Sequence, residues 1–307
     1  MKILVTGGAG FIGSHVAAAL VADGHRVHIL DDFSSGRREN VPDGAEVHAF
    51  DVRSVEAARL MQEEQYEVLV HHAAQMDVRR SVADPGFDAE VNVLGFLNLM
   101  QAGIGYGLKR IVFASTGGAI YGEPEYVPQD EQHPIRPLSP YGITKLTTER
   151  YLYFYQEAYG VSYVALRYAN VYGPRQNPHG EAGVVAIFAT RFLSEDQPLI
   201  NGDGLQTRDY VFVEDVVRAN RAALQYSGSA AFNIGTGRET SVLELFRMIR
   251  DLSESVLPEK HAEAKPGEQQ RSVLDYRLAS RELGWQPETE LYAGLRQTVE
   301  WFRNQRV

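Results

Sequence analysis

Short apolar runs alternate with segments of helical periodicity through the first half of this 307-residue chain. We expect buried strands at six of the runs, which are residues 2–6, 26–30, 45–50, 67–73, 110–115 and 161–168. Helices are predicted between them, among them residues 13–24, residues 89–103 and a segment that begins near Tyr141. The runs are apolar on both faces, which is typical of parallel strands covered by helices on both sides. The pattern therefore predicts an α/β fold with a doubly wound parallel sheet.

Beyond residue 170 the composition and spacing of the predicted elements change. Loops rich in glycine, proline and charge interrupt shorter elements, as in the stretch VYGPRQNPHGEAG at residues 171–183. We expect residues 171–307 to form mainly a smaller α/β C-terminal lobe that receives a substrate. Residues 1–170 form the first domain in this interpretation, with a return segment at about 208–236.

Composition excludes several classes of protein. The net charge is −10, from 40 acidic and 30 basic residues, and this argues against nucleic acid as the main partner. Because the chain has no cysteine, disulfides and thiol chemistry are excluded. The apolar run at the start is too short for a signal peptide, and no run is long enough to span a membrane. We therefore expect a cytoplasmic protein.

A glycine-rich turn joins the first predicted strand to the first helix. Gly7, Gly10 and Gly13 have the spacing GxxGxxG. Glycines at these positions permit a tight turn and let a pyrophosphate approach the N–H groups at the helix start, including those of Phe11 and Ile12. The turn lies between a strand and a helix, as a dinucleotide-binding fingerprint requires. The first domain is therefore expected to be of the Rossmann type.

Acidic residues follow the second and third predicted strands. Asp31 ends the second strand, and a carboxylate there suits the two hydroxyls of an adenosine ribose. Since the same carboxylate would repel a 2′-phosphate, NAD is expected rather than NADP; Asp32 is the alternative residue. Asp51 and Val52 follow the third strand and are placed to flank the adenine.

A tyrosine and a lysine lie one helical turn apart. Tyr141 and Lys145 should share one helix face. A nearby ammonium favours the phenolate, and a tyrosine that ionises near neutral pH is a general base. Ser115 and Thr116 end the fifth predicted strand, at the sheet edge where ligands bind in this architecture. A hydroxyl, a phenol and an ammonium together form a proton-handling set.

Over nearly its whole length, the chain resembles the extended short-chain dehydrogenase/reductase family, and within it the UDP-glucose (UDP-galactose) 4-epimerases. The resemblance rests on the stretches TGGAGFIGSH, DDFSSG, HHAAQMDVRRSVADP, NVLGFLNLM, STGGAIYG, SPYGITK, LRYANVYGPRQ, GDGLQTRDYVFVEDV and LGWQPETELYAGLRQTV. It implies an isomerase with tightly bound NAD that inverts the 4-hydroxyl of a UDP-hexose through a transient 4-keto sugar.

By this resemblance, Tyr141 is the base, and Lys145 keeps it ionised and bonds the nicotinamide ribose. Thr116 or Ser115 shares the hydrogen bond to the sugar 4-hydroxyl. The two glycines at 117–118 add one residue to the usual family segment, so the choice between the two hydroxyls stays open.

The resemblance also implies residues that bind the UDP diphosphate. Asn170 and Arg208 match an asparagine and an arginine with this role. Lys265 stands where relatives have a second arginine, and Glu268 where they have an aspartate. Lysine keeps the charge but lacks the two-pronged geometry of arginine, and Arg271 is the alternative for this phosphate contact.

One further position concerns the choice of sugar. Ser272 falls where relatives vary a residue that lines the sugar pocket, and a bulky side chain there is associated with rejection of N-acetyl sugars. Because serine is small, we expect UDP-N-acetylglucosamine to be accepted beside UDP-galactose.

Three alternatives belong beside this interpretation. A 4,6-dehydratase needs an acid pair after the hydroxyl, where this chain has Gly117 and Gly118. A UDP-glucuronate epimerase or decarboxylase stays open, since Arg79 or Arg80 could receive the carboxylate. A non-catalytic NAD-sensing protein would have no need of the tyrosine and lysine pair.

The sequence also bears on metal binding and on the oligomeric state. His71 and His72 carry no ligand spacing, so we predict packing roles for them and no metal site. The helices at 92–101 and 141–159 carry apolar and aromatic faces. In the resembled family, such helices pair across a two-fold axis into a four-helix contact, and we therefore expect a homodimer.

Overall fold

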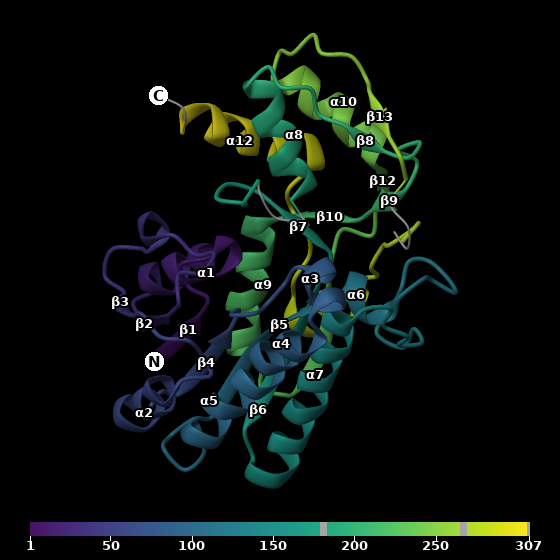
Figure 1. Cartoon of the computed structure of the whole chain (residues 1–307). Helices are drawn as coiled ribbons and strands as arrows, with labels where there is room; N and C mark the ends of the chain where they lie inside the picture. Colours follow the sequence, from purple (N-terminus) through teal and green to yellow (C-terminus); the bar gives the residue numbers. More distant parts are fainter. Residues whose placement is uncertain (179–182, 265–268, 306–307) are drawn as a thin grey trace.

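The computed structural model describes residues 1–178, 183–264 and 269–305 (Figure 1). Its centre is a seven-stranded sheet in the order β11-β6-β5-β4-β1-β2-β3, in which all neighbours are parallel. The strands are β1 (Lys2–Thr6), β2 (Arg26–Leu30), β3 (Glu46–His48), β4 (Val68–His71), β5 (Arg110–Thr116), β6 (Ser162–Tyr168) and β11 (Ala230–Ile234). This order is that of a Rossmann sheet, and the predicted fold class is confirmed. The six predicted strands are present, and β11 comes from the later part of the chain.

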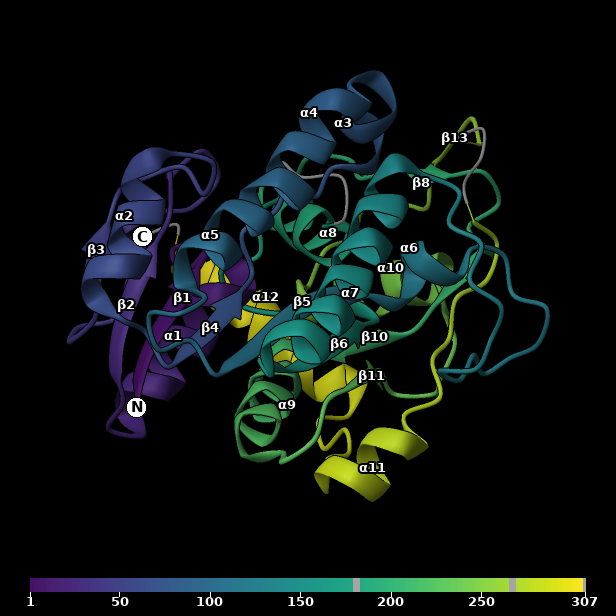
Figure 2. The same cartoon turned by 90° about the horizontal axis from the view of Figure 1, so that it is seen from below.

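Helices cover both faces of the sheet because successive strand residues are apolar on both sides. On β1, Ile3 and Val5 belong to one core cluster and Leu4 to the other. The first cluster lies under α1 (Phe11–Ala22), α9 (Val213–Gln225) and α11 (Arg277–Leu283). The second lies under α2 (Val55–Glu64), α5 (Gly95–Gly103) and α7 (Pro140–Tyr159). Figure 2 shows α5 and α7 on one side of the sheet and α9 and α11 on the other.

The first helix begins and ends two residues earlier than predicted. Gly10 has an extended backbone and is the N-cap, so helical geometry begins at Phe11 rather than at Gly13. Gly24 has a positive φ of 79° and lies beyond the helix end, since this backbone conformation does not continue a helix. The predicted helix at 89–103 consists of a π-helical turn at Glu90–Leu94 followed by α5. The short helices α3 (Val78–Ala83) and α4 (Pro85–Ala89) precede it.

The site helix α7 has a well-defined start. The Ser139 side chain accepts a hydrogen bond from the Gly142 amide, and Pro140 occupies the first helical position, where its missing N–H costs nothing. The helix ends at Gly160, which has a left-handed backbone. Tyr141 therefore lies in the first turn, at the end of α7 nearest the carboxyl ends of the strands.

A second group of helices forms a smaller lobe at one end of the sheet (Figure 1). Phe188, Phe246 and Phe302 belong to a third core cluster, shared by three helices. These helices are α8 (Val184–Leu193), α10 (Val242–Leu252) and α12 (Leu291–Asn304). Three strand pairs accompany them, which are β7 (Asn170–Tyr172) with β10 (Tyr210–Phe212), β9 (Thr207–Arg208) with β12 (Thr240–Ser241), and β8 (Ile200–Asn201) with β13 (His261–Ala262). In the described ranges, no helix is both long and apolar enough to cross a bilayer.

A buried polar network fastens α7 to the sheet. Arg167 on β6 forms a two-pronged ion pair with Glu149 on α7, at 2.6 and 3.0 Å. Ser115 on β5 donates to the same carboxylate at 2.6 Å. Arg167 also donates to the Tyr121 hydroxyl on the short helix α6 (Gly117–Tyr121), and that hydroxyl donates to Asn233 on β11. Every charge in this network therefore has a partner.

Glu149→Gln tests the contribution of this network to stability. The substitution removes one charge of a buried pair and leaves the Arg167 guanidinium inside the core. We expect the free energy of unfolding, measured by urea denaturation, to fall by about 3 kcal/mol. Glu290→Gln is the matched control, because Glu290 pairs with Arg238 where both side chains are 72% exposed, and little change is expected there. Equal losses in the two variants would contradict a special role for the buried pair.

Candidate active site

The turn between β1 and α1 forms a cradle of backbone groups. A Cβ atom on Gly13 would stand 2.2 Å from the Gly7 carbonyl oxygen, so only glycine fits this close approach. A Cβ on Gly10 would meet only that same oxygen, at 3.2 Å, and otherwise open space. No side chain caps α1, and its first turn has no acidic residue. The N–H groups of Phe11 and Ile12 at this helix start thus offer a site that fits a pyrophosphate.

Asp31, the residue after β2, is held against the glycine turn. Its carboxylate oxygens accept hydrogen bonds from the amides of Ala9 and Phe33, each at 2.9 Å. Burial raises the pKa of Asp31, and the two amide donors partly offset this effect. An ionised carboxylate retains lone pairs for two ribose hydroxyls. The rival residue Asp32 is exposed and bonds Ser34 instead.

The two residues predicted to flank adenine have different surroundings. Asp51 forms an ion pair with Arg53 at 2.6 Å. Val52 is buried, its carbonyl accepts from Asn98, and its side chain lies 2.6 Å from where a Cβ on Gly95 would stand. Val52 therefore packs at the start of α5, and the contact of both residues with adenine stays a prediction.

Tyr141 and Lys145 share one face of α7, as predicted from their spacing. The buried Lys145 ammonium donates to the Ala114 carbonyl on β5 at 2.8 Å and lies 5.8 Å from the centre of the Tyr141 ring. Burial lowers the pKa of Lys145 to about 8. Burial also raises the pKa of Tyr141, and the negative charge of Asp88 adds to this effect. The phenol therefore needs positive charge nearby to ionise at neutral pH.

A buried carboxylate near this pair was not predicted from the sequence. Asp88 is fully buried and accepts hydrogen bonds from Thr144 at 2.7 Å, Gln75 at 2.9 Å and Asn92 at 3.1 Å. Thr144 directly precedes Lys145 on α7, and Asn92 lies in the π-helical turn. Gln75, Asn92 and Thr144 lie in stretches on which the family resemblance rests, whereas Asp88 lies between two of them, and no local spacing marks it as a partner of α7.

The two candidate hydroxyls have different surroundings. Ser115 is buried and donates its proton to Glu149, inside the core. Thr116 is the N-cap of α6 and accepts from the Ala119 amide. A Cβ on Gly142 would stand 2.4 Å from the Ala119 carbonyl oxygen, so α6 lies directly against the start of α7. Thr116 is thus the hydroxyl of the two that is not committed to the Glu149 network.

Three chain segments bring three of the predicted substrate-binding residues together, which are Asn170, Arg208 and Ser272. The backbone N–H of Asn170 donates to the backbone carbonyl of Asp209 at 2.9 Å. The backbone N–H of Asp209 in turn donates to the backbone carbonyl of Ser272, also at 2.9 Å. Arg208 precedes Asp209 in this arrangement. The Ser272 hydroxyl lies 3.6 Å from where a Cβ on Gly118 would stand, so this group adjoins α6.

Two of the predicted phosphate-binding residues, Arg208 and Arg271, are described by the structure, and two others are not. Arg271 forms a two-pronged ion pair with Glu239, at 2.6 and 2.8 Å. Arg208 donates to a backbone carbonyl at 2.8 Å. Lys265 and Glu268 lie outside the described residues, and their roles stay predictions.

His71 and His72 have packing roles, as predicted. His71 is buried and hydrogen-bonds the Thr6 hydroxyl at 2.8 Å, and burial lowers its pKa to about 3. His72 stacks on Tyr168. In the described part of the chain, neither histidine belongs to a group of three side chains that could hold a metal ion.

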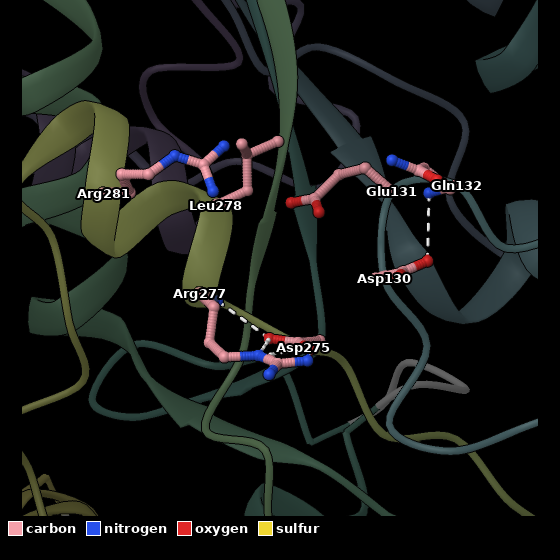
Figure 3. A pocket seen from close by; sticks show the side chains of 7 residues that line it. All are labelled: Asp130, Glu131, Gln132, Asp275, Arg277, Leu278 and Arg281. Carbon is pink, nitrogen blue, oxygen red and sulfur yellow. Dashed lines mark hydrogen bonds and ion pairs between the residues drawn. The ribbon is translucent and has the colours of Figure 1, made fainter.

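A hollow of about 280 Å³ lies away from all of these residues, between α11 and the loop 130–132 (Figure 3). Its lining residues are Asp130, Glu131, Gln132, Asp275, Arg277, Leu278 and Arg281. Arg277 is ion-paired with Asp275 within it. None of the predicted catalytic residues contributes to this hollow, so the site is defined by the sheet edge instead.

Comparisons with known proteins agree with this arrangement. The model of the NAD dependent epimerase/dehydratase family matches residues 3–235. The UDP-glucose 4-epimerase of Mycolicibacterium smegmatis is 46% identical over 311 residues, which cover 99% of each chain. The crystal structure of UDP-glucose 4-epimerase from Thermotoga maritima with UDP-glucose has a TM-score of 0.98 at 46% identity and covers 100% of both chains. The Thermus thermophilus UDP-glucose 4-epimerase in complex with NAD has a TM-score of 0.93 at 45% identity and covers 99% of both chains. The chain therefore belongs to the NAD dependent epimerase/dehydratase family.

Proposed function

We propose that this chain is an NAD-dependent epimerase that inverts the 4-hydroxyl of a UDP-hexose and so interconverts UDP-galactose and UDP-glucose. The observation that carries the proposal is the pairing of Tyr141 with the buried Lys145 at the carboxyl end of β5. Relatives with this activity in their names match the chain over nearly its whole length and support it.

The residues at the sheet edge fit NAD. The glycine turn and the open start of α1 would hold its pyrophosphate, and Asp31 its adenosine ribose. NAD bound in this cradle supplies a hydride acceptor and, when oxidised, a positive charge near Tyr141. In this proposal, residues 1–170 and the return segment at about 208–236 form the NAD-binding domain, and residues 171–307 form mainly the lobe that binds the sugar nucleotide.

The protein side chains handle the proton. Tyr141 removes the proton of the sugar 4-hydroxyl while the 4-keto sugar forms, and Thr116 hydrogen-bonds the same oxygen. The positive charge of Lys145 opposes the rise in the Tyr141 pKa that burial causes. After the sugar has turned about its diphosphate link, Tyr141 returns the proton and the 4-hydroxyl is inverted.

The nucleotide is held at some distance from the reacting carbon. Asn170 and Arg208 bind the diphosphate in this proposal, and Arg271 joins them by exchanging its ion pair with Glu239 for a phosphate. Ser272 leaves room beside α6 for an N-acetyl group, because its small side chain faces Gly118. A firm hold on UDP and a loose hold on the hexose permit the sugar to turn.

We also propose that the chain forms a homodimer through α5 and α7. Large apolar side chains are exposed on α7 and on the π-helical turn that leads into α5, which are Leu94, Ile143, Tyr153, Phe154 and Tyr159. An exposed apolar surface of this kind is typical of a protein–protein contact. Two copies related by a two-fold axis would cover it with four helices.

Turnover without added cofactor tests the function. We expect the purified chain to convert UDP-galactose into UDP-glucose, and UDP-N-acetylglucosamine into its 4-epimer, as resolved by chromatography. Tyr141→Phe should lower kcat by about 10²- to 10⁴-fold, because the base is lost. UDP should still bind to this variant in calorimetry.

The control for this experiment is Tyr292→Phe, which removes the hydroxyl of an exposed tyrosine on α12. Activity of Tyr141→Phe equal to that of this control would show that Tyr141 is not the base. Conversion of UDP-glucuronate or dTDP-glucose alone, with no change in UDP-galactose, would favour a different reaction of the same family.

The pH dependence tests the electrostatics of Asp88. Its negative charge raises the pKa of both Tyr141 and Lys145. In Asp88→Asn both pKa values fall, so both limbs of the kcat profile should move to lower pH. Glu90→Gln is the control, since Glu90 is an exposed carboxylate of the same segment. A profile of Asp88→Asn that coincides with the parent would contradict this coupling.

The dimer is tested by sedimentation velocity at about 10 μM chain, a concentration at which a stable interface stays formed. We expect one species of twice the chain mass for the parent and a monomer for Ile143→Glu, because a charge would be buried in the apolar contact. Leu199→Glu, at an exposed apolar residue between α8 and β8, is the control and should stay dimeric. A monomeric parent would contradict the proposal.

A further inference from the structure

Three side chains that the proposed reaction does not use converge on the two outermost strands of the sheet. His28 on β2 lies directly opposite Glu46 on β3, and His48 follows two residues after Glu46. Since side chains two residues apart in a strand share a face, the strand register places all three on the same face of the sheet. Figure 1 shows β2 and β3 at one edge of the molecule, whereas the proposed catalytic pair lies on α7, which contacts β5 through Lys145.

The spacing of these side chains matches the coordination sphere of a small cation. The Nε2 atom of His28 lies 3.5 Å from one Glu46 carboxylate oxygen, and the Nε2 atom of His48 lies 3.6 Å from the other. The three ligand atoms all lie within 4.8 Å of one another. Ligands of a tetrahedral zinc ion stand about 3.4 Å apart, because each bond is about 2.0–2.1 Å long. No other group of three such residues occurs in the described part of the chain.

One ring nitrogen of the cluster, Nε2 of His28, has no hydrogen-bond partner. The Nδ1 atom of His28 lies 2.9 Å from the Tyr66 hydroxyl and 3.0 Å from the Nε2 atom of His48. The Nε2 atom of His28 is buried, has no hydrogen-bond partner and faces the Glu46 carboxylate. When Nδ1 carries the ring proton and donates it to Tyr66, Nε2 presents a lone pair to a negatively charged group. A cation between them would satisfy both.

We propose that His28, Glu46 and His48 bind one divalent transition-metal ion, of which Zn²⁺ is the type, with a water molecule at the fourth position. Two imidazoles and one carboxylate are a zinc ligand set, and nitrogen ligands disfavour Mg²⁺. Tyr66 orients the His28 ring through its second nitrogen, as partners of metal-binding histidines do.

Access and charge are both consistent with an ion here. The Glu46 side chain is 55% exposed, so an ion can enter from solvent. The Lys2 ammonium, whose charge acts on His28, is paired with Glu64. Metal binding would tie the edge strand β3 to β2, which ends directly before Asp31. The sequence predicted no metal site, and it is the strand register that brings residues 28, 46 and 48 together.

Calorimetry on the full-length chain, untagged and treated with EDTA, tests the site. We expect one Zn²⁺ per chain and a higher unfolding temperature with ZnCl₂, and neither effect with MgCl₂. Glu46→Gln and His48→Gln should each weaken Zn²⁺ binding by at least about tenfold, since loss of a mere supporting partner already costs 10- to 100-fold. Tyr66→Phe should weaken it by about tenfold for that reason.

The control variant is His261→Gln, which removes an exposed histidine on β13 and should bind Zn²⁺ like the parent. Circular dichroism establishes that each variant is folded. Absence of Zn²⁺ binding in the parent, or binding by the folded Glu46→Gln and His48→Gln chains that equals the control, overturns the proposal. Because neither measurement involves turnover, the result is independent of the proposed epimerase activity.

Discussion

The buried face of α7 is polar from Thr144 to Glu149, and this places a strict condition on how the helix packs. A polar group removed from water destabilises the fold unless it is hydrogen-bonded, so α7 can dock only where each of these groups has a partner. The partners are the Asp88 carboxylate for Thr144, the Ala114 carbonyl for Lys145, the Asn92 carbonyl for Thr148 and Arg167 for Glu149. A shift of the helix along the sheet would break all four contacts together. The position of Tyr141 is thus fixed by interactions to which Tyr141 itself contributes nothing.

The lobe is attached to the sheet edge in a comparable way, through the backbone. Asn170, Asp209 and Ser272 come from three separate segments and are joined by amide–carbonyl hydrogen bonds. The buried Asp209 carboxylate adds bonds from Thr236 and from the amide of Leu274. Residues proposed to hold the nucleotide are therefore carried on a hydrogen-bonded support, and the small Ser272 side chain faces Gly118 on α6. This division suits a substrate that must turn while its nucleotide stays in place.

The features that could be predicted from the sequence are those that depend on residues close together in the chain. The six strands, the glycine turn and the shared face of Tyr141 and Lys145 follow from periodicity and spacing over a few residues, and the structure has them all. The boundaries of α1 were predicted two residues late, because Gly10 rather than Gly13 has the extended backbone of an N-cap. Contacts between distant segments could not be predicted in this way. Asp88 and Thr144 are 56 residues apart, and only the docked helix makes one a partner of the other.

The buried ammonium of Lys145 has a consequence for how such a protein evolves. Its pKa of about 8 in the folded chain lies below the ordinary value of 10.5, so unfolding favours the charged form. The stability that this group contributes is present above pH 10.5 and is lost as the pH falls through 8. Near neutral pH the folded chain therefore carries a charge that its own interior disfavours. Selection for stability alone would replace this lysine with an apolar residue, whereas the catalytic role that we propose for it would favour its retention.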